Sequence, residues 1–137
     1  MEVHGNRDVC VGTVARRTGC PVDVDQWEWG CGFYPGTAPG QGQTGTAADF
    51  EASRVAFEAA WQRLLPTMTE ANFQEWRDNR DLTAWKYAMW EANAKMPTAV
   101  TSGRSKCFCR APIDIATAHR HALTAHSRLM KFAANLP

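Results

Sequence analysis

The alternation of apolar and polar side chains in the first third of the chain predicts β-strands. Residues 9–16 (VCVGTVAR) are rich in β-branched side chains, which favour an extended backbone. Residues 26–34 alternate with the period of a half-buried strand. The apolar face of that second segment consists of Trp27, Trp29, Cys31 and Phe33. Residues 17–25 contain Gly19 and Pro21 and form a loop, so the two segments are expected to pair as an antiparallel hairpin.

Two registers are open for this hairpin. Pairing Val11 with Trp29 also sets Val9 near Cys31. A slip by one residue brings Cys10 opposite Cys31 and turns the valines to the other face. The first register buries more apolar surface, and we expect it for that reason.

Residues 35–45 (PGTAPGQGQTG) hold four of the ten glycines and form a loop. One interpretation is a flexible loop that contacts a ligand beside Phe33 and Tyr34, with peptide N–H groups free to approach a phosphate. The other is a long hairpin connection that leads into a third short strand near Gln43–Thr46. The stretch lacks the fixed glycine spacing of phosphate-binding loops, which favours the hairpin connection.

Helical periodicity replaces alternation after this loop. A capping box at Thr46–Asp49 predicts a helix start, and Pro66 predicts its end. One apolar stripe runs along this helix and should lie on the aromatic face of the hairpin. The stripe consists of Phe50, Phe57, Trp61 and Leu64. The expected result is a small antiparallel sheet of two or three strands packed on a helix, in an α+β fold.

A second helical region is expected from a capping box at Thr67–Glu70 to about Lys95. It carries two apolar stripes, which indicates two neighbours. The first stripe is Leu82, Trp85, Met89, Ala92 and Met96, and the second is Phe73, Trp76, Tyr87 and Trp90. One face of the helical region could pack on the sheet. The other face could pack on the C-terminal segment, on a protein partner or on a second copy of the chain. The polar run 77–81 (RDNRD) predicts a solvated bend or break.

These patterns divide the chain into four parts: a sheet-and-helix domain at 1–66, a helical segment at 67–96, a linker at 97–105 and a C-terminal module at 106–137. The length of 137 residues and 45% hydrophobic content, with six Trp and six Phe, are typical of a globular chain. No apolar run approaches about 18 residues, and the N-terminus lacks the features of a signal peptide. We therefore expect no membrane contact and a cytoplasmic location.

Charge changes this picture for the C-terminal module. Residues 1–99 carry nine Lys and Arg against thirteen Asp and Glu, a net charge of −4. Residues 100–137 carry six basic residues against Asp114 alone, a net charge of +5. Basic charge gathered on one module predicts a nucleic-acid partner.

The same module holds the ligand pattern of a zinc site. Cys107 and Cys109 are followed after eleven residues by His121 and His126, and structural zinc commonly takes two thiols on a turn and two imidazoles on a helix. His119 competes, but on a helix it lies about 10 Å along the axis from His126 and on the side opposite His121. His121 and His126 are about 140° apart, so the helix end must tighten or unwind. We therefore expect Zn²⁺ at Cys107, Cys109, His121 and His126, while Cys10, Cys20 and Cys31 are ordinary thiols or a second, weaker site.

Residues 104–132 resemble a C2H2-type zinc finger, with two cysteines followed by a helix that bears two histidines. The chain has Ile113 where the family places an aromatic residue and Ala118 where it places a large apolar residue. Only one residue separates the two thiols, instead of two or more. The resemblance implies a helix whose outer face, at Asp114, Thr117 and Arg120, reaches base edges in the major groove. Phosphate contacts would come from Arg104, Lys106, Arg110, Arg128 and Lys131. Helix packing would use Ile115, Ala122, Leu129 and Phe132.

The upstream stretch 27–36 (WEWGCGFYPG), together with Phe50–Trp61, resembles small uncharacterised alphaproteobacterial proteins. This resemblance implies a bacterial protein carried by a phage or plasmid.

The zinc ligands and the basic charge together predict a zinc-dependent nucleic-acid-binding accessory or regulatory protein. The alternative is a protein-interaction module or inhibitor in which zinc is purely structural. An enzyme is not expected, because four protein ligands would leave zinc no open position and no nucleophile elbow or P-loop is present.

Overall fold

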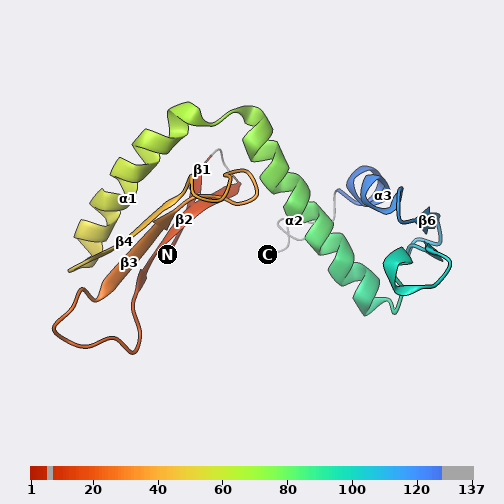
Figure 1. The fold of residues 1–137 in the computed structure, drawn as a ribbon, viewed down its shortest axis with the longest axis horizontal. Helices are drawn as coiled ribbons and strands as arrows, with labels where there is room; N and C mark the ends of the chain where they lie inside the picture. The colour runs from red at the N-terminus through yellow and green to blue at the C-terminus, as the bar shows by residue number, and fades with distance from the viewer. Residues whose placement is uncertain (6–7, 128–137) are drawn as a thin grey trace, which may run out of the picture. The chain divides into compact units, whose positions relative to one another are not determined.

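The structure is a computed structural model that describes residues 1–5 and 8–127. This part of the chain is α+β, with a four-stranded antiparallel sheet, a separate two-stranded sheet and three α-helices (Figure 1). It forms two compact units, Met1–Trp76 (unit 1) and Arg77–Pro137 (unit 2). The division falls inside helix α2 (Glu70–Glu91) and not in the segment 97–105 that the composition indicated as a linker.

Unit 1 contains the larger sheet, whose strands follow one another in chain order and are all antiparallel to their neighbours. The strands are β1 (Glu2–Gly5), β2 (Val9–Arg16), β3 (Trp27–Cys31) and β4 (Gln43–Ala47). The expected strands are confirmed as β2, β3 and β4. Residues 32–42 connect β3 and β4 as a hairpin, which the absence of a fixed glycine spacing favoured, and the last three residues of the expected loop belong to β4. Strand β1 was not expected from the sequence.

Both registers considered for the β2–β3 hairpin are wrong. Val14 pairs with Trp29 and Gly12 with Cys31, three residues from the expected pairing. In the pairing of β2 with β1 a β-bulge skips Val11, and a bulge turns consecutive residues to one face. Val9, Val11 and Val14 are thereby all buried although their spacing is not strictly alternate. Gly12 fits there because a Cβ would lie only 2.4 Å from the Phe57 ring.

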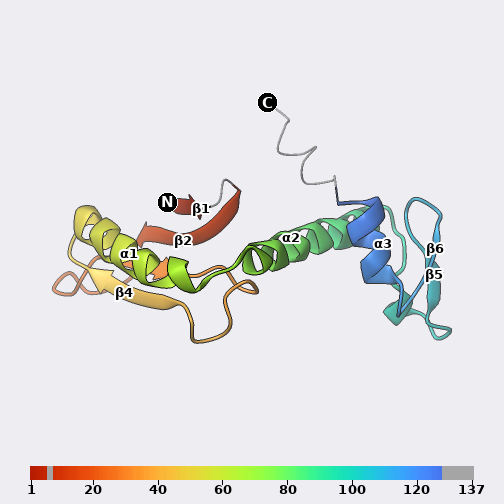
Figure 2. The same cartoon turned by 90° about the horizontal axis from the view of Figure 1, so that it is seen from above.

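Helix α1 (Phe50–Leu64) covers one face of this sheet (Figures 1 and 2). The expected capping box is wrong: Thr46 lies in β4, and Asp49 is the N-cap, accepting from Ala52 N at 2.8 Å. The expected aromatic contact with β3 is confirmed, since the rings of Trp27 and Phe50 lie 5.6 Å apart. Helix α1 ends at Leu64, and Pro66 lies in a 3-10 helix over Leu65–Thr67.

Helix α2 begins at Glu70 and not at Thr67. Its first turn is fixed by Thr69, whose N–H and hydroxyl both donate to Asn72 Oδ1. Phe73 belongs to the unit 1 core and stacks on Phe33 at 4.8 Å. The helix is continuous through residues 77–81 and Asp81 is buried, so the expected solvated break is wrong. Phe73 before this polar run and Trp85 after it are both buried in hydrophobic cores.

Unit 2 is a β-hairpin followed by a helix, packed on the second half of α2. The hairpin strands are β5 (Arg104–Lys106) and β6 (Pro112–Asp114), and the helix is α3 (Ala118–Ala125). The buried side chains of its core are Trp85, Met89, Cys107, Ile113, Ala118 and Ala122. The segment 97–105 is structured as well, with a 3-10 helix at Pro97–Ala99 in which Pro97 is buried.

The expected packing of the C-terminal helix holds in part. Ala122 is fully buried, whereas Ile115 is 62% exposed because it precedes α3 in the turn after β6. Leu129 and Phe132 lie outside the described residues. Over residues 1–5 and 8–127, no helix combines the length and the apolar character that a membrane span requires.

Candidate metal centre

The β5–β6 hairpin positions two thiols at its turn. Cys107 follows β5 directly, and its N–H donates to Ala111 O at 2.9 Å. Arg110 N–H donates to Cys107 O at 2.8 Å, and Arg110 has a left-handed φ of 72°. A left-handed residue at this point closes a tight turn. Such a turn allows Cys107 and Cys109 to approach one point although only one residue separates them.

Helix α3 positions the two imidazoles. His121 lies inside the helix, while His126 is its C-cap with φ −124° and ψ 12°, outside helical geometry. His126 N–H still donates to Ala122 O at 3.1 Å. On a straight helix the two side chains would point about 140° apart. The end of the helix at Ala125 supplies the change of direction that the sequence required, and the two imidazole rings lie 5.0 Å apart.

The four ligand atoms form a compact group. Cys107 Sγ lies 3.4 Å from His126 Nε2, and Cys109 Sγ lies 3.4 Å from His121 Nε2. The two Nε2 atoms are 3.2 Å apart, and all four ligand atoms lie within 4.8 Å of one another. With Zn–S near 2.3 Å and Zn–N near 2.0–2.1 Å, a regular tetrahedron has N···S edges of about 3.6 Å and an N···N edge of about 3.3 Å. The group therefore has the dimensions of a four-coordinate metal site.

Burial and aromatic contacts shield one half of this group. Cys107 is buried, and the indole Nε1–H of the fully buried Trp85 donates to its Sγ at 3.3 Å. The Phe108 ring, between the two thiols in sequence, lies 4.6 Å from the His126 ring. Burial, and secondarily the charge of His121, lowers the pKa of His126. The neutral imidazole, which is the form that binds metal, is thus favoured at His126.

The competing histidine and the expected base-reading residues lie outside the ligand group: His119, Thr117 and Arg120 are exposed and Asp114 is half-buried. His119 is exposed on α3 and outside the ligand group, as the helical geometry indicated. The Thr117 hydroxyl donates to Asp114 Oδ1 and accepts from Asp114 N–H, and this bonding lowers the pKa of Asp114. Two of the three expected base-reading side chains are therefore engaged with each other, and Arg120 is exposed one turn further along the chain.

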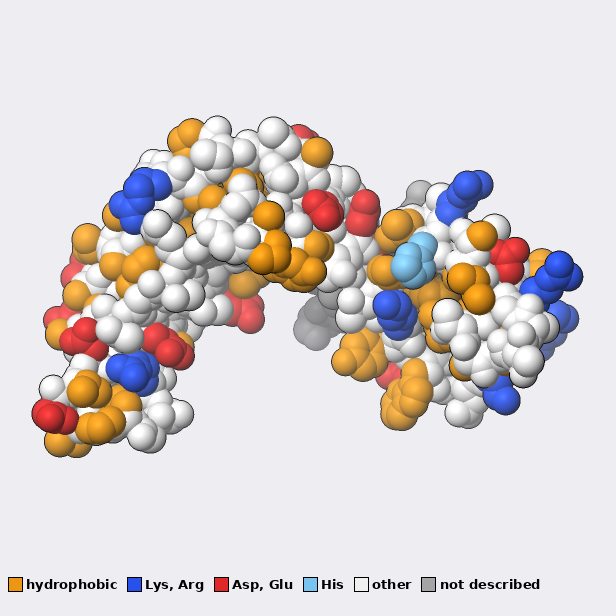
Figure 3. Space-filling view, in the orientation of Figure 1, with side chains coloured by type: hydrophobic (Ala, Val, Ile, Leu, Met, Phe, Trp, Pro, Cys, Tyr) orange, Lys and Arg blue, Asp and Glu red, His pale blue; other side chains and the backbone are white. Residues whose placement is uncertain are grey.

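Basic side chains lie on the surface around the centre. Exposed positions are Arg104, Lys106, Arg110 and Arg120. Figure 3 shows Lys and Arg side chains at several places on the visible face of unit 2. Arg128 and Lys131, which the sequence also indicated as phosphate contacts, lie outside the described residues.

Two contributors to the centre were not recognised in the sequence. Trp85 was expected to face a neighbour, but its hydrogen bond to Cys107 spans 22 residues and has no local signal. Phe108 had a local signal, because it lies between two expected ligands. An aromatic residue in that position can pack on an imidazole ligand while the thiols on either side turn toward the metal.

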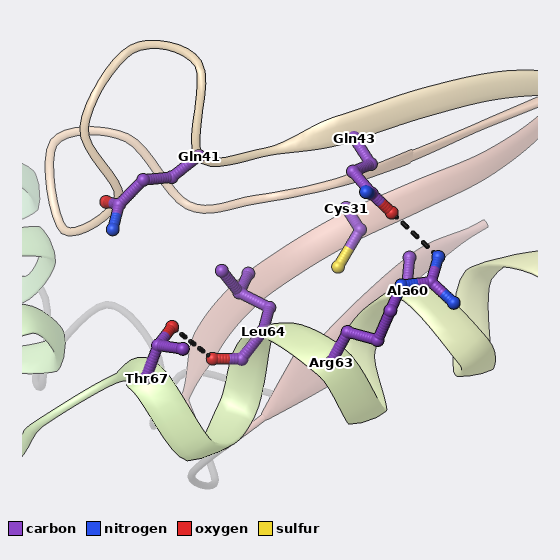
Figure 4. A pocket seen from close by; sticks show the side chains of 7 residues that line it. All are labelled: Cys31, Gln41, Gln43, Ala60, Arg63, Leu64 and Thr67. Carbon is purple, nitrogen blue, oxygen red and sulfur yellow. Dashed lines mark hydrogen bonds between the residues drawn. The ribbon is translucent and has the colours of Figure 1, made fainter.

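A pocket of about 290 Å³ in unit 1 is a weaker candidate site (Figure 4). Its lining includes the Cys31 thiol and the Arg63 guanidinium, and Arg63 donates to Gln43 Oε1 at 2.8 Å. Burial raises the pKa of Cys31, which the charge of Arg63 only partly opposes. A thiol held protonated is a poor nucleophile and a poor ligand. This pocket also lies at the lower limit of typical ligand pockets, about 300 Å³.

Comparison with known proteins adds no relative: no family model, no curated protein and no solved structure matches the chain. The chemistry of the site is therefore argued from its own atoms. Two thiols and two imidazoles converge on one point, and this group could hold a metal ion.

Proposed function

We propose that Cys107, Cys109, His121 and His126 bind one zinc ion in a closed, structural centre. The observation that carries this proposal is the set of distances among the four ligand atoms, which fits the edges of a zinc tetrahedron. Two thiolates with two imidazoles suit zinc, whereas magnesium and calcium prefer oxygen ligands. Four protein ligands leave no open position for a substrate, so we propose a binding protein and not an enzyme.

We further propose that unit 2 is a variant of the C2H2-type finger that binds nucleic acid, most simply DNA. The order of hairpin and helix supports this, with thiols at the turn and imidazoles on α3. The exposed basic side chains around the centre add electrostatic attraction for phosphates. Arg120 would read guanine, while Arg104, Lys106 and Arg110 would contact the backbone. Thr117 would not contact a base, because its hydroxyl is bonded to Asp114.

Metal content tests the first part. Protein purified under reducing conditions should retain one equivalent of zinc through gel filtration. Cys109→Ser should lose it, and this exposed ligand is the better variant because its removal leaves the apolar core intact. The matched control is Cys20→Ser, which removes a thiol outside the group and should keep the zinc. Retention of a full equivalent by both Cys109→Ser and Cys107→Ser would contradict the assignment.

Salt-dependent binding tests the second part. The logarithm of the affinity for a duplex should fall linearly with the logarithm of salt concentration. Arg104→Gln with Lys106→Gln should reduce that slope by about two, and Arg120→Ala should weaken discrimination between sequences by about 1–3 kcal/mol. Lys95→Gln, an exposed charge before the hairpin, is the matched control. An affinity indifferent to salt, or no binding to duplex or single strand, would contradict nucleic-acid binding.

A second candidate function, protein–protein interaction, is favoured by a specific feature of α2. Tyr87 and Trp90 are 66% and 76% exposed, and with Thr83 and Lys86 they line a shallow groove of about 470 Å³. Large exposed aromatic side chains are typical of interaction surfaces. If this stripe joins two copies of the chain, Tyr87→Ser with Trp90→Ser should convert a dimer to a monomer in sedimentation experiments. A wild-type monomer at high concentration would contradict self-association.

A further inference from the structure

The edge of the unit 1 sheet carries three ligand-type side chains on one face. Glu2 and His4 are two residues apart on β1 and therefore share a face. The residues that alternate with them face the core: Val3 packs against it, and a Cβ on Gly5 would lie 2.9 Å from Val11 and 3.1 Å from Trp61. Glu2 and His4 consequently project from the opposite face and are exposed.

The β-bulge adds a third ligand to this pair. Val3 pairs with Gly12, and a regular ladder would place His4 opposite Val11. Because the pairing skips Val11, His4 lies opposite Cys10. Residues directly opposite in an antiparallel pair have Cβ atoms about 4.5–5.5 Å apart on the same face. Bulges recur where a sheet re-aims a side chain at a site, and this one sets a thiol beside an imidazole.

The donor atoms of these three residues converge. His4 Nε2 lies 3.9 Å from Glu2 Oε2, and the three ligand atoms all lie within 4.8 Å of one another. The Cys10 thiol makes a contact of 3.6 Å with Gly12 O, a weak bond that metal ligation can replace. Carboxylate, imidazole and thiolate in one place are more specific than an acidic cluster, because each donor type is a recognised zinc ligand.

We propose that Glu2, His4 and Cys10 form a second metal site, open to solvent, for a divalent ion of the zinc type. A thiolate and an imidazole favour zinc over magnesium and calcium, which require oxygen ligands. Three protein ligands leave one tetrahedral position, which water fills. Cys10 does not belong to the Cys107 group, and the second site gives this thiol a role.

This site differs from the Cys107 group in strength. Glu2 and His4 are exposed, and their side chains must be ordered when the ion binds, which costs conformational entropy. The Cys107 group has four ligands and a buried thiol. The second site therefore fills after the first. Since its residues belong to unit 1, it stands whether or not unit 2 binds zinc.

Titration with cobalt, a spectroscopic substitute for zinc, tests the proposal on the full chain. Metal-free, reduced protein should take up two equivalents, tight and then weaker, each increasing thiolate-to-cobalt charge-transfer absorbance. His4→Ala with Cys10→Ser should lose the weaker equivalent and keep the tight one. Cys107→Ser with Cys109→Ser should lose the tight equivalent and keep the weaker one. These outcomes separate a failure of the second site from a failure of the first.

A matched control removes one imidazole and one thiol from elsewhere. His119→Ala with Cys20→Ser should retain both equivalents, because neither residue belongs to a ligand group. His4 is exposed and Cys10 is outside the apolar core, so circular dichroism should show the fold unchanged in the test variant. A wild type in which no bound equivalent depends on His4 and Cys10, or a weaker equivalent that persists without them, would overturn the proposal.

Discussion

Unit 1 and unit 2 bury their interiors in different ways. Among the described residues of unit 1 the buried core contains nine hydrophobic residues, including Phe33, Phe57 and Phe73. Among the described residues of unit 2 the corresponding core has six, of which two are alanines and one is the ligand Cys107. A core this small supplies little apolar burial, and small modules usually need metals or disulfides. If the Cys107 group binds zinc as proposed, unit 1 would fold by packing alone and unit 2 would depend on ligation.

Metal removal should separate the two units most strongly. Structural zinc contributes about 10–16 kcal/mol of apparent binding free energy in finger peptides, more than a small core can replace. With a strong chelator, hydrogen exchange followed by mass spectrometry should show loss of protection over residues 104–126 and retained protection in β2, β3 and α1. Equal protection in both units after complete metal removal would contradict the dependence of unit 2 on ligation.

A core truncation should produce the opposite pattern. Phe57 is buried against Gly12, so Phe57→Ala should lower the free energy of unfolding of unit 1 by about 3–5 kcal/mol. Urea-dependent hydrogen exchange in β2 and β3 measures this change. The control is Val55→Ala, because Val55 is exposed on the same helix, and its effect should stay within about 0.5 kcal/mol. Zinc content should be unchanged in both variants.

The indole of Trp85 connects packing and ligation inside unit 2. Trp85→Phe removes the N–H that donates to Cys107 Sγ and should weaken zinc affinity by about 10–100-fold, the usual effect of losing a partner of a metal ligand. Competition with a chromophoric chelator gives the affinity. Trp90→Phe makes the same change at an exposed indole and should leave the affinity unaltered. Equal affinities for both variants would assign Trp85 to packing alone.

Helix capping in unit 1 should give the smallest effect. Asp49→Ala removes the acceptor for Ala52 N–H at the start of α1 and should cost about 1 kcal/mol. Asp49→Asn keeps an acceptor oxygen and should be close to wild type. Thermal unfolding of unit 1 followed by circular dichroism measures both variants. A loss confined to unit 2 would be inconsistent with the division into two units.

Side-chain periodicity was sufficient for the elements that have a regular pattern. The alternation at 26–34 predicted β3, and the stripe from Phe50 to Leu64 predicted the sheet-facing side of α1. Strand β1 was missed because its four residues offer Val3 as their only β-branched side chain. The hairpin register was wrong because strict alternation was assumed along β2, whereas Val11 is skipped by a bulge against β1 and Gly12 has no room for a side chain against Phe57. Both features depend on contacts with distant residues.

The ligand group was easier to predict than its surroundings. Ligand spacing and helical angles selected His121 and His126. The same angles required the backbone to leave helical geometry before His126, and α3 ends at Ala125. The contribution of Trp85 depends on how α2 packs against the hairpin, and no local pattern encodes that contact. The cluster at Glu2, His4 and Cys10 depends on a bulge and was equally inaccessible from the sequence.

X-ray absorption at the zinc edge tests the central claim most directly. Metal-free protein loaded with one equivalent of zinc should show two sulfur ligands near 2.3 Å and two nitrogen ligands at about 2.0–2.1 Å, with no oxygen ligand. Cys109→Ser should reduce the sulfur count to one at most. A wild-type spectrum with fewer than two sulfurs, or with zinc coordinated mainly by oxygen, would contradict a closed centre at Cys107, Cys109, His121 and His126.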